Sequence, residues 1–156
     1  MQNGMVKNNI SYKIVKGFLE ENIFQETANL YSEIFKDADL DFFKHRIKKQ
    51  PELFSILAFN NKKLIGFKIA YPYDENIFYS WIGGVLPKHQ RKGIAKHMSK
   101  LQEEYAVLEG FIKLRTKSMN SYKAMMILNL KNGFDITKIY TNSKGQTKVV
   151  FEKQLH

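Results

Sequence analysis

The chain has 156 residues, of which 44% are apolar, and this is enough for one hydrophobic core of ordinary size. Its 25 lysines and arginines outnumber its 15 aspartates and glutamates, which leaves a net charge of +10, and cysteine is absent. Disulfide bonds, thiolate metal sites and a cysteine nucleophile are therefore excluded. The positive charge favours anionic partners and leaves a basic nucleic-acid-binding domain open as one interpretation.

No apolar stretch approaches the length of a membrane helix. The longest runs, 56–59 and 124–128, are far shorter than the roughly 20 residues that span a bilayer. The first five residues lack the basic and apolar regions of a signal peptide. We therefore expect a cytoplasmic protein without a membrane partner.

The first part of the chain predicts one strand and two helices. Apolar residues alternate over 9–16, which is typical of an edge strand. They recur at helical spacing over 22–35, where Asn22 is a candidate cap. Asp39 begins a second, shorter helix that ends at Pro51.

Three strands joined by tight turns follow. The third contains Gly83 and Gly84, and glycines inside a strand indicate a β-bulge or the close approach of another group. The predicted strands cover residues 53–59, 64–71 and 77–85.

The last part of the chain alternates between helix and strand. A helix over 90–108 carries apolar residues spaced by four and three, which predicts a buried stripe. Ser118 and Asn120 are cap types for a helix that runs to about Lys131 and ends at Gly133. The stripe consists of Ile94, Met98, Leu101, Tyr105 and Leu108. Further strands are predicted at 111–117, 134–141 and 147–153.

The order of elements is β-α-α-β-β-β-α-β-α-β-β and predicts one mixed α/β domain over residues 1–156. The hairpin-joined strands indicate an antiparallel part of the sheet. The strand–helix–strand unit over 77–117 indicates a parallel pair. We therefore expect a central, twisted, mostly antiparallel sheet flanked by about four helices.

The segment from Val85 to Ala95 carries the clearest chemistry because it joins a strand to a helix through Gly93. The amides in the first turn of a helix have no partner inside it, and they lie at the positive end of the helix dipole. Such a turn is a ready phosphate site. Gly93 and Ala95 leave room for the ligand, while Arg91 and Lys92 add positive charge at its rim.

The order Gln-Arg-Lys-Gly-Ile-Ala over 90–95, preceded by Val-Leu-Pro, resembles motif A of the GNAT N-acetyltransferase superfamily. The element order follows the GNAT arrangement over nearly the whole chain, and the segment 120–134 looks like the family's fourth helix with its terminal Gly-Phe. The resemblance implies acetyl-CoA as the acetyl donor and direct transfer to a primary amine in a ternary complex.

The resemblance also implies positions for the bound donor. Val85 would pair its backbone with the pantetheine arm, and Asn120 would contact the same arm. Counting back from Gly133 places the family's asparagine at Tyr122 instead. The pyrophosphate would be held by the backbone of Arg91, Lys92, Gly93, Ile94, Ala95 and Lys96.

The chain departs from the family pattern at the leaving group. Many members have a tyrosine four residues before the glycine of Gly-Phe, and Asn129 occupies that position here. An amide can donate a hydrogen bond to a thiolate but cannot protonate it. Two interpretations of Asn129 therefore stay open. It is either a catalytic hydrogen-bond donor or a buried core amide with its hydrogen bonds satisfied. Tyr122 and Tyr140 are substitute acids.

The candidate base is Glu75, which would act through a water ordered by Tyr79 and Ser80. The favoured alternative is that Glu75 is a simple turn residue in Asp74-Glu75-Asn76. The acceptor is not identified, and the aromatic residues of the N-terminal half are either a lining for it or core. They are Phe42, Phe43, Phe54, Tyr71, Tyr73, Phe78, Tyr79 and Trp81.

Other site patterns are missing from the sequence. It has no nucleoside-triphosphate P-loop, no dinucleotide fingerprint and no Gly-x-Ser-x-Gly elbow. We expect no metal, and we expect the histidines, which lack ligand spacing, on the surface. They are His45, His89, His97 and His156.

Two further classes stay open beside the acetyltransferase. One is a non-catalytic relative that binds acetyl-CoA, and the other is the nucleic-acid-binding domain. Because the basic residues concentrate around Gly93 instead of spreading over a broad face, we expect no nucleic-acid partner. A homodimer through the edge of the last hairpin is also open.

Overall fold

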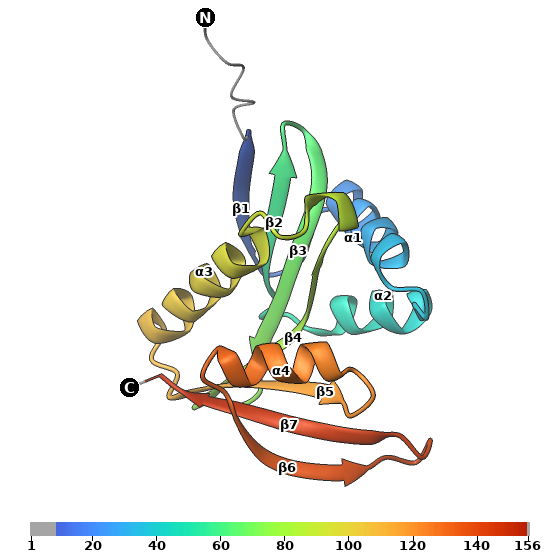
Figure 1. Ribbon diagram of the computed structural model, residues 1–156. Coiled ribbons are helices and arrows are strands. Elements are labelled where there is room, and N and C mark those ends of the chain that lie inside the picture. Colours follow the sequence, from blue (N-terminus) through green and yellow to red (C-terminus); the bar gives the residue numbers. More distant parts are fainter. Residues whose placement is uncertain (1–8, 156) are drawn as a thin grey trace, which may run out of the picture. The chain divides into compact units, whose positions relative to one another are not determined.

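The structure is a computed structural model that describes residues 9–155, whose strands form one seven-stranded sheet in the order β1-β2-β3-β4-β5-β7-β6 (Figure 1). The signal-peptide prediction and the prediction for His156 lie outside these residues. The strands are β1 (Ile10–Lys16), β2 (Phe54–Asn60), β3 (Lys63–Pro72), β4 (Ile77–Val85), β5 (Lys113–Met119), β6 (Asp135–Thr141) and β7 (Thr147–Gln154). The helices are α1 (Glu21–Ile34), α2 (Leu40–Lys49), α3 (Ile94–Leu108) and α4 (Lys123–Lys131), with a 3₁₀-helix η1 at Pro87–His89.

Strand directions confirm the predicted mixed α/β fold. β1 pairs antiparallel with β2, and β7 pairs antiparallel with both β5 and β6. β4 and β5 form the parallel pair, with Ile77 opposite Lys113. The edge position of β1 is also confirmed.

The chain divides into two compact units. Unit 1 contains residues 9–69 and Ile82–Leu101, and unit 2 contains Ala70–Trp81 and residues 102–155. β3, β4 and α3 contribute residues to both units.

Unit 1 has an aromatic core formed by α1, α2 and β3. Tyr31 stacks on Phe43 with ring centroids 4.1 Å apart, and Phe43 meets Phe67 edge-on at 6.0 Å. Asp39 caps α2 as predicted, because its side chain accepts a hydrogen bond from the Phe42 amide. Asn22 is not a cap, since α1 already begins at Glu21.

Unit 2 packs around Phe78 of β4. Its ring lies 4.9 Å from that of Phe111 and 5.5 Å from that of Tyr105. On β5, Arg115 bonds Glu152 of β7 at 2.7 Å. Burial alone would lower the pKa of the Arg115 guanidinium, but the bond to Glu152 raises it above its ordinary value.

The buried face of α3 differs from the predicted stripe at its C-terminal end. Leu108 is 85% exposed, whereas Ala106 and Gln102 are buried. Burial follows a spacing of four residues from Ile94 and Met98 onward, and this row runs obliquely around a helix. The predicted stripe alternated four and three and so followed a different row.

The boundaries of β5 and α4 also differ from prediction. Phe111 belongs to a turn, because its amide donates to the carbonyl of Ala106. β5 extends to Met119, which pairs with Lys148 of β7. Ser118 is therefore part of a strand, and α4 begins only after Tyr122.

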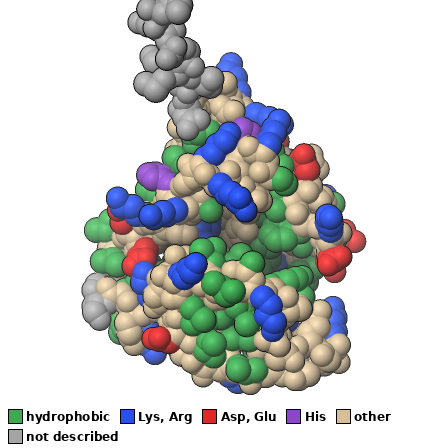
Figure 2. All heavy atoms as spheres, in the orientation of Figure 1, with side chains coloured by type: hydrophobic (Ala, Val, Ile, Leu, Met, Phe, Trp, Pro, Cys, Tyr) green, Lys and Arg blue, Asp and Glu red, His purple; other side chains and the backbone are tan. Residues whose placement is uncertain are grey.

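α4 is apolar around most of its circumference and is partly exposed. Figure 2 shows apolar side chains at the surface where Figure 1 places α4 and β6. They include Met125, Ile127, Leu128, Leu130, Ile136 and Ile139, each 45–62% exposed. Among residues 9–155, no helix is both long and apolar enough to cross a membrane.

Candidate functional site

The predicted phosphate turn lies in unit 1, but its helix begins later than expected. α3 starts at Ile94 and not at Gln90. Arg91 and Gly93 have φ values of 62° and 83°, which lie in the left-handed region and cannot continue a right-handed helix. The turn therefore places its glycine directly before the first helical residue.

The start of α3 presents free backbone donors. The first helical bond runs from the His97 amide to the Gly93 carbonyl at 2.9 Å. The amides of Ile94, Ala95 and Lys96 thus have no acceptor within the helix. A Cβ at Gly93 would meet no described atom within 4 Å, so the space beside these amides is open.

A side-chain bond fixes the turn to the end of β4. The Gln90 amide donates to the Val85 carbonyl at 3.0 Å. Gln90 is therefore a positioning residue, although the sequence suggested it only as part of the motif. Arg91, Lys92 and Lys96 are exposed.

His89 is buried, which corrects the prediction that it lies on the surface. It is the last residue of the 3₁₀-helix η1, which begins at Pro87. Burial lowers the pKa of its imidazole, and the nearby charges of Lys92, Lys88 and Lys63 lower it further. His45 and His97 are exposed as expected.

β4 carries the extra residue that its glycines predicted. The Tyr73 amide donates to the Ile77 carbonyl, and the Leu86 amide donates to the Ile65 carbonyl, both at 2.9 Å. Between these two bonds the β4 side of the pair has one residue more than β3. Such an excess is a β-bulge.

The two glycines of β4 also allow close approach. A Cβ at Gly83 would lie 3.0 Å from the carbonyl oxygen of Phe67, and one at Gly84 would lie 3.1 Å from the side chain of Ile34. The side chain of Lys68 lies against Gly83, and burial lowers the pKa of its ammonium to about 8.

Asn129 lies in unit 2 and is buried in α4 with 8% of its surface exposed. Its side-chain nitrogen has no hydrogen-bond partner among the described residues. The structure confirms that Asn129 is a buried amide, but within residues 9–155 it shows no hydrogen bond for the side-chain nitrogen. A buried donor without a partner is costly to the fold.

The remaining candidates of unit 2 are more exposed. Tyr122 precedes α4 and is 49% exposed, and Asn120 accepts a hydrogen bond from Lys123 at 3.1 Å. Glu75 is exposed in the turn between β3 and β4. The side chain that organises this turn is Asp74, which accepts bonds from two backbone amides at 2.8 Å.

Most of the predicted aromatic lining is core. Tyr79 and Ser80 are buried in β4 at 8% and 6% exposure, whereas Phe42 and Tyr73 are the two exposed rings of the set. The buried or half-buried members are Phe43, Phe54, Tyr71, Phe78, Tyr79 and Trp81.

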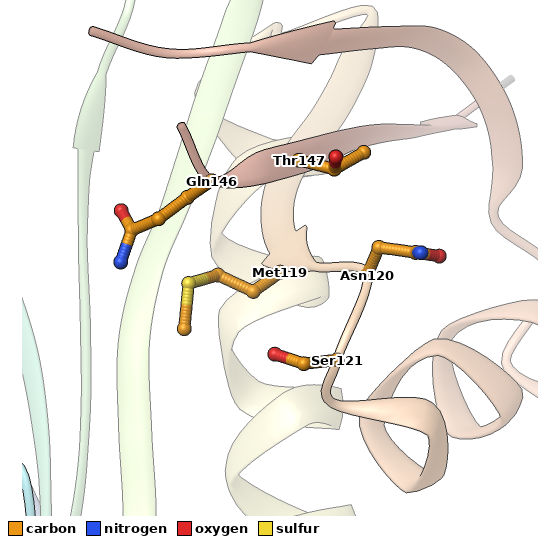
Figure 3. Close-up of a pocket in the computed structure, with 5 residues that line it drawn as sticks. All are labelled: Met119, Asn120, Ser121, Gln146 and Thr147. Carbon is orange, nitrogen blue, oxygen red and sulfur yellow. The ribbon is translucent and has the colours of Figure 1, made fainter. Parts of the chain in front are cut away.

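Unit 2 has a cavity that the sequence did not indicate. Its volume is about 340 Å³, and it lies where the end of β5 meets the start of β7. Figure 3 shows Met119, Ser121 and Gln146 pointing to one side, and Asn120 and Thr147 pointing away from them. Only Asn120 had been predicted, because the others meet through strand pairing and share no local motif.

A family model matches more than half of the chain. Residues 20–126 match the family model described as Acetyltransferase (GNAT) family. No curated protein matches the chain.

Solved structures share the fold at low sequence identity. A GNAT family acetyltransferase from Elizabethkingia anophelis with acetyl-CoA bound is 19% identical with a TM-score of 0.74, and the match covers 95% of this chain and 99% of that one. The ribosomal-protein-S18-alanine N-acetyltransferase of Escherichia coli is 15% identical with a TM-score of 0.75, over 93% and 94% of the two chains. NAA60 of Arabidopsis thaliana in complex with acetyl-CoA is 15% identical with a TM-score of 0.73, over 93% and 98%.

Proposed function

The chain belongs to the GNAT acetyltransferase family, and on that premise we propose that it transfers the acetyl group of acetyl-CoA to a primary amine. The observation that carries the proposal is the turn before α3. Its left-handed Gly93 leaves three helix amides and an open space beside exposed cations. This arrangement suits the pyrophosphate of acetyl-CoA.

The residues of the turn fit the donor in two ways. The amides of Ile94, Ala95 and Lys96 would bind phosphate oxygens, while Arg91 and Lys92 would supply charge from the rim. The carbonyl of Val85 already accepts from Gln90. The bulge in β4 interrupts its pairing with β3 and is a suitable place for backbone bonds to the pantetheine arm.

The chemistry needs a neutral amine and a stabilised leaving group. The amine nitrogen attacks the thioester carbonyl, the new C–N bond forms, the C–S bond breaks, and CoA leaves as a thiolate while the amine loses one proton. Asn129 would donate its unpartnered N–H to the leaving sulfur. Glu75 would accept the amine proton through water, and Tyr122 is the alternative proton donor.

Calorimetric titration with acetyl-CoA tests the binding part of the proposal. The Gly93→Asn variant keeps a residue that tolerates positive φ but places a side chain beside the helix amides. We expect micromolar binding in the parent and at least a tenfold loss in the variant.

The Gly145→Asn variant is the matched control. Gly145 also has a positive φ, 75°, and a Cβ there would meet nothing within 4 Å. This variant has a comparable backbone strain in the turn between β6 and β7, outside the turn before α3, and we expect it to retain acetyl-CoA binding. Equal binding in all three proteins contradicts the assignment of the turn.

A second function is favoured by one observation, the amide at position 129. Because an amide cannot protonate a thiolate, a relative that binds acetyl-CoA without catalysis is the alternative. Release of free thiol from acetyl-CoA in the presence of a panel of primary amines separates the two. Binding without thiol release for every amine supports the non-catalytic relative.

A further inference from the structure

Two lysines of unit 2 share the ring of Tyr140. The Lys117 ammonium lies 5.7 Å from the centroid of this ring and 5.9 Å from that of Tyr79. The Lys138 ammonium lies 5.5 Å from the Tyr140 centroid. Two like charges are thus held near one ring, whose face attracts cations.

Neither lysine has an acidic partner in the described part of the chain. Glu152 is bound to Arg115 at 2.7 Å and lies 3.8 Å from Lys113. Glu103 is bound to Lys153 at 3.0 Å. The charges of the pair are therefore available to a ligand.

Strand register places the pair on one face of the sheet. Val150 of β7 pairs with Lys117 of β5 on one side and with Lys138 of β6 on the other. Tyr140 and Met119 are both opposite Lys148, two residues along β7. Because side chains two residues apart point the same way, all of these groups share a face.

The cavity at the end of β5 opens on this face. Met119 belongs to both, and Figure 3 shows Ser121 and Gln146 pointing to the same side as Met119. The side-chain carbonyl oxygen of Gln146 accepts a hydrogen bond from the side-chain amide of Asn142 at 2.9 Å. The side-chain N–H groups of Gln146 remain available to donate. The Ser121 hydroxyl is a second donor, and no acidic residue lines the cavity.

We infer that this cationic face, made of Lys117, Lys138, Tyr140, Ser121 and Gln146, binds an anionic group, a carboxylate or a phosphate, carried by the acceptor amine. The inference rests on the proposed function, because it names the class of acceptor. Ammonium, amide and hydroxyl donors together match anionic oxygen. A polyamine acceptor is disfavoured by like-charge repulsion.

The extent of the face favours a small anion over a nucleic acid. The next row of the same face holds Arg115, Glu152 and Asp135, so acidic groups end the positive region after one row. A long polyanion needs many phosphate contacts along its backbone. One anionic group on a small acceptor can be bound by Lys117 and Lys138 together with the donors of the cavity.

Binding is tested first without any reaction. The CoA-saturated protein is titrated with sodium acetate and, separately, with inorganic phosphate, and the side-chain amide of Gln146 is followed by NMR. We expect a saturable shift with at least one of the two anions, and the stronger one identifies the anion type. The Lys117→Gln, Lys138→Gln double variant weakens that binding at least tenfold.

The Lys131→Gln variant is the matched control, because it removes an exposed lysine of the same unit at the end of α4. It retains the anion-dependent shift. No saturable shift with either anion, or the same shift in the double variant, overturns the inference. Tighter binding of a short duplex DNA at the same signals also overturns it in favour of a nucleic-acid surface.

Acetyl transfer is then compared among acceptors of similar size. Beside the reacting amine, β-alanine and phosphoethanolamine carry an anionic group, ethanolamine carries a neutral hydroxyl, and ethylenediamine carries a second, cationic amine. We expect kcat/KM to be at least tenfold higher for an anionic acceptor, and to fall in the double variant with acetyl-CoA affinity unchanged. Equal rates for all four overturn the inference and leave the proposed function standing. Anion binding without acetylation of any amine contradicts the proposed function and leaves the anion site standing.

Discussion

Replacing Asn129 with leucine separates stability from catalysis. Its side-chain nitrogen is buried and has no partner, and an unmet donor of this kind costs about 1–3 kcal/mol. Leucine has the same number of side-chain heavy atoms and the same branch at Cγ, and it has no polar atom. We therefore expect Asn129→Leu to raise the free energy of unfolding by about 1 kcal/mol, which corresponds to a Tm increase of about 2–4 °C at this chain length.

The same change should lower turnover. If the Asn129 amide donates to the leaving thiolate, its loss removes a charge-assisted bond of about 1.5–3 kcal/mol, or roughly 10–100-fold in kcat. Thermal unfolding measures the first effect, and thiol release from acetyl-CoA in the presence of a free amine that the protein acetylates measures the second.

Gln102→Leu is the matched control for this prediction. Gln102 lies in α3, is 2% exposed, and also has an unpartnered side-chain nitrogen. We expect it to gain stability as Asn129→Leu does, with kcat unchanged. A large loss of stability in Asn129→Leu together with unchanged turnover would refute the reasoning, because it would show that the amide serves the fold.

Two further predictions concern pH. His89 has a lowered pKa in the folded state, so its contribution to stability is present above about pH 6.5 and is lost as the pH falls toward the lowered value. Between pH 7.5 and 5.5, the free energy of unfolding measured in urea should fall less for His89→Gln than for the parent. Equal decreases contradict the burial of His89. Burial lowers the pKa of Lys68 from 10.5 to about 8, so the charged ammonium destabilises the folded state. Lys68→Met should therefore raise the free energy of unfolding at pH 7, and this gain should shrink between pH 8 and 10.5; a gain that is independent of pH shows that charge is not its cause.

Local features of the fold were predictable because they depend on neighbours in the chain. Asp39 caps α2 through an amide three residues away, and Asn61 adopts a φ of 56° in the turn between β2 and β3. Gly93 ends the turn before α3 for the same kind of reason, since positive φ is a property of one residue.

The start of α4 shows where local signals fail. Ser118 and Asn120 are good cap residues, yet β5 continues through Ser118 because β7 pairs with it. Pairing with a strand about 30 residues away thus overrides a local preference of modest size. The burial of His89 and the exposure of Leu108 are likewise decided by which parts of the fold cover them.

The sequence by itself determined the order of the elements, the mixed sheet and the glycine turn before α3. These follow from periodicity, turn residues and one short motif, all of which act over a few residues. Only the tertiary structure decided that Asn129 holds an unpartnered donor, and that Lys117 and Lys138 share one ring beside a cavity. The physical reason is that burial and strand register depend on residues far apart in the chain, and no local pattern records them.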